Sequence, residues 1–225
     1  MATKSAEETD KTMNTDAGQP GKRSKTRIGA ANTDRILDAA LVEFARNGLR
    51  GTRIEQVAEA AGMSKTNLLY YFRTKDDLYK AALTRTLDIW LKPLRELDSA
   101  IGPVAALTAY VEQKLDYSRR FPEASRLFAM EIMQGAPHLK AVLAGDLADL
   151  VRRKTATING WIAAGELAPI EPQHLLFTIW ATTQHYADFS EQIRTLTGKD
   201  LSDEDFFAQT KTALVGMILR GVLPR

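Results

Sequence analysis

Apolar residues recur at intervals of three and four positions along almost the whole chain from Thr33 onward, and no stretch alternates with period two for long. This spacing places apolar side chains on one face of a helix, whereas a half-buried strand requires alternation. Glycine and proline separate the periodic segments. The sequence therefore predicts an all-α fold of about nine helices, over residues 33–47, 53–61, 65–72, 75–97, 103–120, 123–134, 139–164, 172–192 and 203–221.

Composition narrows the class of protein. The 225 residues are 44% hydrophobic, which is ample for a buried core, and the chain contains no cysteine, which excludes disulfides and thiolate zinc sites. The longest uncharged stretch, residues 172–187, includes Gln, His and Thr and is too short for a membrane span. With no apolar signal segment near the N-terminus, we expect a cytoplasmic protein. Because the net charge is only +2, any nucleic-acid surface must come from local clustering of charge.

The N-terminal 32 residues contain no aromatic side chain and are rich in polar residues. Such a segment buries too little apolar area to offset its ordering entropy, so residues 1–32 are predicted to be a disordered basic arm. Residues 22–27 hold four basic side chains and no acidic one. This run suits a DNA backbone or minor groove, and it is equally typical of a solubilising tail.

Three capping patterns define the beginning of the folded chain. Thr52 with Glu55 and Thr74 with Asp77 have the spacing of capping boxes, and Ser64 precedes another short helix. Gly62 lies between the second and third predicted helices and supplies a tight turn. The sequence thus predicts a helix-turn-helix head over residues 33–80, followed by a helical body over residues 81–225.

The third predicted helix presents polar side chains on one face. Leu68 and Phe72 are placed to pack inward, while the outward-facing residues of the same helix carry hydroxyls, an amide and a positive charge of the kinds that contact phosphates and base edges. A helical hairpin with a merely solvated face would show the same periodicity. The residues expected at the DNA surface are Thr52, Lys65, Thr66, Asn67, Tyr70, Tyr71 and Lys75.

A longer motif makes the DNA-binding interpretation specific. Residues 51–65 read GTRIEQVAEAAGMSK, and residues 71–78 read YFRTKDDL. This stretch resembles the signature of TetR-family repressors, which implies a DNA-reading helix-turn-helix fused to a ligand-sensing, dimerising helical body. Two positions depart from the family pattern: Thr66 replaces a small residue, and Leu69 stands where the family generally has a phosphate-contacting tyrosine, whose role Tyr70 is expected to take.

Further segments resemble the pyrimidine-utilisation regulators of this family, which respond to uracil and thymine. They are residues 64–72 (SKTNLLYYF), 87–91 (LDIWL), 124–128 (ASRLF) and 179–189 (IWATTQHYADF). The resemblance implies a small planar effector, and it favours Trp180 and Gln184 as its ligands over a role in the core.

The same residues have a chemical interpretation of their own. Trp180 and Gln184 are four positions apart and share one helix face. An amide offers a donor and an acceptor that match a pyrimidine imide edge, and an indole offers a flat stacking surface. Trp90, on the helix that leaves the head, is placed to form an opposing wall. On spacing alone, a tryptophan on an apolar face is more often a core residue.

The last two predicted helices are apolar on more than one side, which is typical of a helix pair with a second partner. In TetR-family proteins that partner is the same pair from another subunit, and the resulting dimer binds a pseudo-palindromic operator. The residues expected at this homodimer interface are Leu175, Ile179, Tyr186, Phe206, Leu214, Met217 and Ile218.

The leading hypothesis is a homodimeric transcription regulator whose affinity for double-stranded DNA changes when uracil or thymine binds in the body. One alternative is a TetR-family regulator of another planar or lipophilic molecule, and a distant one is a helical carrier or enzyme on a borrowed fold. No nucleophile, carboxylate pair or cofactor loop stands out, so neither catalysis nor a cofactor is expected. The three histidines lack ligand spacing, so no metal site is expected either.

Overall fold

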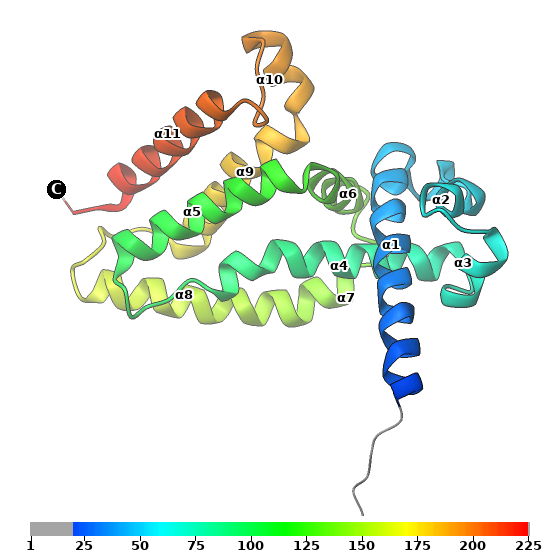
Figure 1. Cartoon of the computed structure of the whole chain (residues 1–225). Coiled ribbons are helices and arrows are strands. Elements are labelled where there is room, and N and C mark those ends of the chain that lie inside the picture. Colours follow the sequence, from blue (N-terminus) through cyan, green and yellow to red (C-terminus); the bar gives the residue numbers. More distant parts are fainter. Residues whose placement is uncertain (1–19, 225) are drawn as a thin grey trace, which may run out of the picture.

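The computed structural model describes residues 20–224, with side chains from Ile28 onward, and this part of the chain is all-α as predicted (Figure 1). None of the helices described is long and apolar enough to cross a membrane. The elements are α1 (Pro20–Gly51), α2 (Ile54–Ala60), α3 (Lys65–Tyr71), α4 (Lys75–Arg95), α5 (Pro103–Arg120), α6 (Pro122–Met133), α7 (Lys140–Val142), the π-helical turn η1 (Leu143–Leu147), α8 (Ala148–Ala163), α9 (Pro172–Asp188), α10 (Ser190–Thr197) and α11 (Glu204–Val222).

Helix α1 begins at Pro20, well before the predicted start at Thr33, so the expectation of a disordered arm is wrong for residues 20–32. Lys, Arg and Ala, which favour helix, outnumber glycine here. The Asn32 amide also donates to the Tyr71 hydroxyl at 2.9 Å, which fastens this turn to α3. Residues 1–19 and the side chains of the basic run 22–27 lie outside the described part, so a DNA contact from that run stays a prediction.

The cap predicted at Thr52 lies one residue later. Arg53 is the N-cap of α2, and its backbone N–H donates to Gln56 Oε1 at 2.9 Å. The Thr52 hydroxyl instead lies 2.8 Å from the Gly48 carbonyl oxygen, which it helps to satisfy where α1 leaves helical geometry. The other two caps are confirmed, because Ser64 Oγ accepts from Asn67 N and Thr74 Oγ1 accepts from Asp77 N.

Gly62 forms the tight turn between α2 and α3 with a φ of +66°, a conformation that favours glycine. A Cβ at this position would lie 2.9 Å from the Arg35 guanidinium. That guanidinium donates to the Ala61 carbonyl at 2.6 Å and so ties α1 to the turn. The backbone conformation therefore favours glycine at this turn, and a Cβ would in addition push the Arg35 guanidinium away from the Ala61 carbonyl.

Helix α4 connects the head to the body and runs through the expected boundary at residue 80 (Figure 1). It packs against α1 at one end and against α5, α6 and α8 along the rest of its length. Tyr79 lies at this joint: its ring meets Phe44 of α1 edge-on, with centroids 5.0 Å apart, and its hydroxyl donates to the buried Glu131 of α6 at 3.1 Å. The head and the body thus share packed side chains.

Two helices predicted as continuous are interrupted. The segment expected over residues 139–164 contains the π turn η1 before α8 begins. The segment expected over 172–192 ends at Asp188, because Phe189 leaves helical geometry and stacks on His185 with centroids 4.9 Å apart. Neither interruption changes the periodic pattern enough to be read from the sequence.

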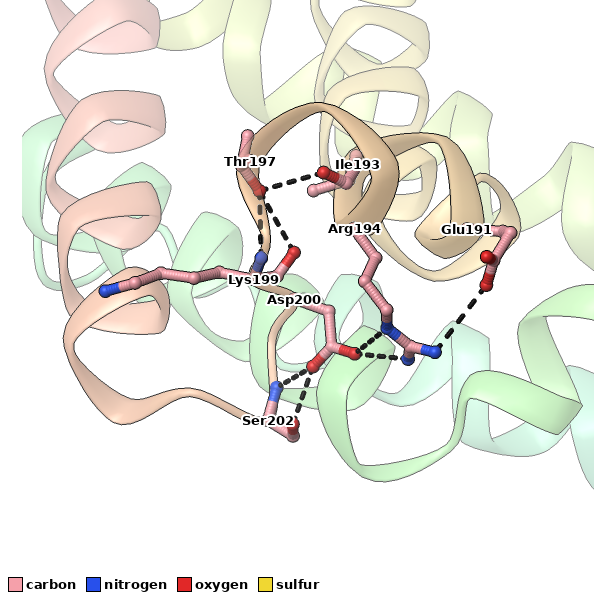
Figure 2. Close-up of polar contacts among 7 residues, drawn as sticks. All are labelled: Glu191, Ile193, Arg194, Thr197, Lys199, Asp200 and Ser202. Atoms are coloured by element: carbon pink, nitrogen blue, oxygen red, sulfur yellow. Dashed lines mark hydrogen bonds and ion pairs between the residues drawn. The ribbon is translucent and has the colours of Figure 1, made fainter.

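The connection between α10 and α11 is held by a polar network that Figure 2 shows. Arg194 Nε donates to Asp200 at 3.1 Å, and Ser202 N donates to the same carboxylate at 2.8 Å. The Ser202 hydroxyl also donates to this carboxylate, at 2.6 Å. The bond from that hydroxyl, then the bond from Arg194 and then the Ser202 backbone bond lower the pKa of Asp200 to about 2. We call Arg194, Asp200 and Ser202 the α10–α11 clasp.

Candidate functional site

The N-terminal half of α3 presents an exposed polar surface. Lys65, Thr66 and Asn67 are all exposed there, and Tyr70 is 82% exposed. Leu68 is fully buried against the head core, as the predicted orientation of this helix requires. Side chains of these types on the second helix of a helix-turn-helix are suited to phosphates and to base edges in a major groove.

Lys65 is paired within the head. Its ammonium lies 2.7 Å from Glu55 of α2, and both side chains are more than half exposed. The hydrogen bond from Lys65 lowers the pKa of the Glu55 carboxyl. A phosphate must therefore compete with Glu55 for this lysine, and exposed pairs of this kind are weak enough to exchange.

Three residues predicted at the DNA surface are placed differently. Thr52 is only 1% exposed, so the expectation that it touches DNA is wrong; its side chain caps the end of α1 instead. Lys75 is half-buried and donates to the Thr52 carbonyl at 2.9 Å. Tyr71 is half-buried as well, and its hydroxyl accepts from Asn32. In this structure Tyr71 links α3 to α1, and Lys75 links the start of α4 to the connection between α1 and α2. Both remain partly exposed, so their contact with DNA stays a prediction.

A cavity of about 40 Å³ lies within the body, between α4, α5, α6, α9 and the π turn. Trp90, Trp180 and Gln184, predicted separately from two segments ninety positions apart, all line it. This volume is well below that of typical small-molecule sites, so binding of an effector requires the lining side chains to move apart. The full lining is Leu87, Trp90, Leu91, Leu94, Tyr110, Lys114, Phe128, Leu147, Trp180 and Gln184.

The two indoles of the cavity differ in their hydrogen bonding. Trp180 Nε1 donates to the Tyr110 hydroxyl at 2.6 Å, whereas Trp90 Nε1 is buried with no partner in the described part of the chain. Burial raises the pKa of Tyr110, which keeps its proton and has it available for donation. The cavity therefore combines a wall of apolar side chains with several polar groups that the protein leaves unsatisfied.

Lys114 of α5 is a polar residue of this cavity that the sequence interpretation missed. It is 3% exposed, and its ammonium lies 3.9 Å from the centroid of the Trp90 ring. Burial lowers its pKa to about 7, and the negative charge of Asp188 only partly opposes that effect. A signal was present in the sequence, because Lys114 follows Tyr110 by four positions and Val111 by three and so falls on the apolar face of its helix.

A surface groove between α6 and α9 adjoins the cavity. It shares Phe128, Trp180 and Gln184 with the cavity, and at its rim Met133 and Phe189 are exposed. These shared side chains lie between the cavity and the groove. Movement of Trp180 or Gln184 would open a path for a small molecule.

Four of the seven residues predicted at a dimer interface lie inside the protomer. Leu175, Ile179, Leu214 and Ile218 are at most 7% exposed, so they have no surface to offer a second subunit and stabilise the body instead. Tyr186 and Phe206 are half-buried and pack on each other, with centroids 6.3 Å apart. Met217, at 55% exposure, is the one of the seven that faces solvent.

Comparison with known proteins accounts for nearly the whole chain. Residues 36–82 match the model of bacterial regulatory proteins of the tetR family, and residues 83–225 match that of the C-terminal region of YcdC-like proteins. The HTH-type transcriptional regulator RutR of Escherichia coli strain K12 is 52% identical over 205 residues, which is 91% of this chain and 96% of RutR.

Solved structures show the same architecture. A transcriptional regulator of Streptomyces coelicolor, SCO4942, is 27% identical with a TM-score of 0.64 and covers 84% of this chain and 97% of its own. KstR2 of Mycobacterium tuberculosis, described as a ketosteroid transcriptional regulator, shares the fold with a TM-score of 0.69 at 17% identity, over 86% of this chain and 95% of its own. The matched families and relatives are regulators, not enzymes. The chain belongs to the TetR family and is a DNA-binding transcription regulator.

Proposed function

We propose that the protein is a homodimeric regulator of pyrimidine-metabolism genes whose affinity for its operator is modulated by uracil or thymine in the body cavity. The observation that carries this proposal is the meeting of Trp90, Trp180 and Gln184 around one small cavity. The 52% identity to RutR over most of both chains supports it.

The cavity chemistry suits a planar imide. Because the Trp180 N–H is already engaged by Tyr110, this indole offers its flat face to a ligand. Gln184, one helical turn further along α9, offers a donor and an acceptor to the adjacent C=O and N–H of an imide edge. The large apolar share of the lining excludes water around those few polar groups.

In this proposal a ligand bound in the cavity changes the position of the head through α4. Trp90 lies on the same helix as Tyr79, which packs against Phe44 of α1. A ligand that displaces Trp90 therefore acts on a rigid element that also supports the head. In a dimer the two α3 helices must reach successive major grooves about 34 Å apart, so a small rotation of α4 in each subunit changes operator affinity.

The dimer interface in this proposal is the exposed face of α9 and α11. Phe177 on α9 and Met217 on α11 are each about half exposed, and small side chains such as Ala181 and Ala213 lie exposed on the same two helices. Large apolar side chains exposed beside small ones permit close approach of a second helix pair. Two-fold pairing of this face gives a four-helix interface.

Isothermal titration of the wild type and of Gln184→Leu with uracil and with thymine tests the proposal. Leucine keeps most of the volume but leaves the polar edge of the ligand unpaired, at a cost of about 1–3 kcal/mol. The expected result is a loss of roughly one to two orders of magnitude in affinity, with ligand-free operator binding retained. Equal affinity in both proteins would remove Gln184 from the site, and no pyrimidine binding to the wild type at millimolar concentration would overturn the pyrimidine assignment.

A second candidate is a TetR-family regulator of another small planar or lipophilic molecule. The leucine-rich lining of the cavity favours it, since Leu87, Leu91 and Leu94 all contribute. Titration with an aromatic and a fatty-acid panel under the same conditions distinguishes the two. Tighter binding of a panel member than of either pyrimidine would favour this second candidate.

A further inference from the structure

Lys114 is a buried cation without a full partner. Within the described part of the chain no hydrogen-bond acceptor or carboxylate contacts its ammonium, and the Trp90 face is its nearest electron-rich group. A cation–π contact compensates only part of the loss of hydration. Asp188 acts on Lys114 at longer range, and its carboxylate is already engaged by the Ser125 hydroxyl at 2.5 Å.

A second lysine of the body, unlike Lys114, has hydrogen-bond acceptors for its ammonium. Lys154 of α8 is also partly desolvated, and its ammonium donates to the carbonyls of Arg95 at 3.0 Å and Leu97 at 2.7 Å. It caps the end of α4 and has a structural role. Lys114 makes no such bonds within residues 28–224, and it lines the cavity.

The position of Lys114 gives the cavity a second polar group that can bind a ligand, in addition to Gln184. It comes from α5, whereas Gln184 comes from α9, and both line the same cavity, with Trp90 carried by α4. A planar ligand resting against the indoles thus meets an amide from one helix and an ammonium from another. An ammonium donates and does not accept, so the ligand atom that protonated Lys114 holds is an acceptor.

We propose that Lys114 reads a carbonyl oxygen of the effector, and so restricts effectors to planar molecules that present an acceptor oxygen in addition to the group bound by Gln184. This inference rests on the proposed function and deepens it. Pyrimidines with two carbonyl oxygens satisfy both residues. A purely lipophilic molecule leaves the ammonium buried and unpaired, and that cost selects against it.

The surroundings of Lys114 define the pH at which this recognition operates. From α4 and the π turn only uncharged side chains line the cavity, and from α6 only Phe128 does. The titratable groups nearby are Tyr110 on α5, which stays protonated, and Asp188 on α9, on which Arg126 and His185 also act. Because the pKa of Lys114 is about 7 in the free protein, an acceptor oxygen that raises this pKa makes binding take up a proton above that pH.

Uracil titrations of the wild type, Lys114→Met and the control Lys154→Met at pH 6 test the proposal. Lys114→Met should bind uracil about ten- to a hundredfold more weakly, since a charged hydrogen bond is lost, while its ligand-free thermal midpoint rises because a buried charge has been removed. Lys154→Met should show the reverse, with unchanged uracil affinity and a lowered midpoint. Equal uracil affinity in Lys114→Met and the wild type would overturn the inference while leaving the proposed function intact.

Two pyrimidines that each lack one oxygen, pyrimidin-2-one and pyrimidin-4-one, identify the atom that is read. The oxygen held by Lys114 is the one whose removal weakens binding to the wild type but not to Lys114→Met. Equal losses in both proteins for both compounds would overturn the inference.

A measurement on the wild type alone covers the case in which Lys114→Met does not fold. Uracil affinity should be constant well below the pKa of Lys114 in the free protein, about 7, and should fall by up to about tenfold per pH unit above it. An affinity that stays flat on both sides of this pKa would overturn the inference. Failure of uracil to bind the wild type at any pH would overturn the proposed function and this inference with it.

Discussion

The head and the body cavity hold their polar groups in opposite ways. On α3 the side chains suited to DNA are exposed, and Lys65 is already paired with Glu55. In the cavity Lys114 and Trp90 Nε1 are buried and have no such partner among the described residues. When DNA binds, an exposed and paired side chain exchanges a weak ion pair within the protein for a contact with phosphate. A buried and unpaired group instead gains its first hydrogen-bond partner when a ligand binds. The first is suited to salt-sensitive binding of a long polymer, and the second to selection of one small molecule.

The largest expected effect comes from dissociating the proposed dimer, so that its two DNA-binding heads are no longer linked. Met217→Glu places a charge on the exposed face of α11, where the proposed dimer would bury it without a partner. We expect a monomer with operator affinity lowered by two to four orders of magnitude, because two half-sites are no longer bound together. Sedimentation and operator titration measure the two effects. A dimeric variant with full affinity would place the interface elsewhere.

The turn of the head should be the next most sensitive position. Gly62→Ala forces a Cβ towards Arg35 and holds a non-glycine residue at a φ of +66°, so we expect the free energy of unfolding to fall by about 1–3 kcal/mol. Gly160→Ala is the matched control, because Gly160 lies in α8 with open space around its Cα and alanine favours helix there. Urea denaturation should give opposite signs for the two, and equal destabilisation would contradict this account of the turn.

A smaller effect tests the pairing of Lys65 directly. Lys65→Ala should weaken binding to all DNA sequences and reduce the salt slope by about one unit. Glu55→Gln removes the competing carboxylate, so it should strengthen binding by a few-fold at low salt. DNA titrations at several salt concentrations provide both values. If Glu55→Gln weakens binding, the ion pair positions Lys65 rather than competing for it.

The smallest effect concerns the α10–α11 clasp, where a paired carboxylate has no proposed ligand. The folded-state pKa of Asp200, about 2, lies below its unfolded value, so its stabilisation is complete above about pH 4 and is lost as the pH falls towards 2. Because Arg194 is exposed, we expect only about 1 kcal/mol. Asp200→Asn should flatten this part of the pH profile of stability, and an unchanged profile would show that the clasp contributes nothing measurable.

The sequence predicted the head better than it predicted the body. Caps at Ser64 and Thr74 depend on local chemistry, so their positions could be read directly. The burial of Leu175 and Leu214 depends on which of two apolar sides of a helix meets the protomer's own core, and that choice is made by tertiary packing. The start of α1 was missed because its support from Tyr71 is distant in sequence.

The cavity residues also show that the sequence does not determine which side chains tertiary packing brings together. Trp180 and Gln184 share one helix face by their four-residue spacing, but it was the resemblance to pyrimidine-utilisation regulators that favoured them as ligands over a role in the core. Lys114 was not predicted, although its place on the apolar face of α5 was visible, because a lysine there has the same sequence pattern as one whose ammonium reaches solvent. Only the three-dimensional arrangement distinguishes a lysine that reaches water from one that reaches Trp90.

The tryptophans give the protein an optical property that follows from their positions. Of its three indoles, Trp90 and Trp180 line the cavity and Trp161 is buried in α8 outside that lining. Indole emission responds to polarity and to stacked aromatic rings, so an occupant of the cavity changes the fluorescence of two tryptophans and leaves the third as an internal reference. The arrangement that forms the effector site thus also reports, without any added label, whether that site is filled.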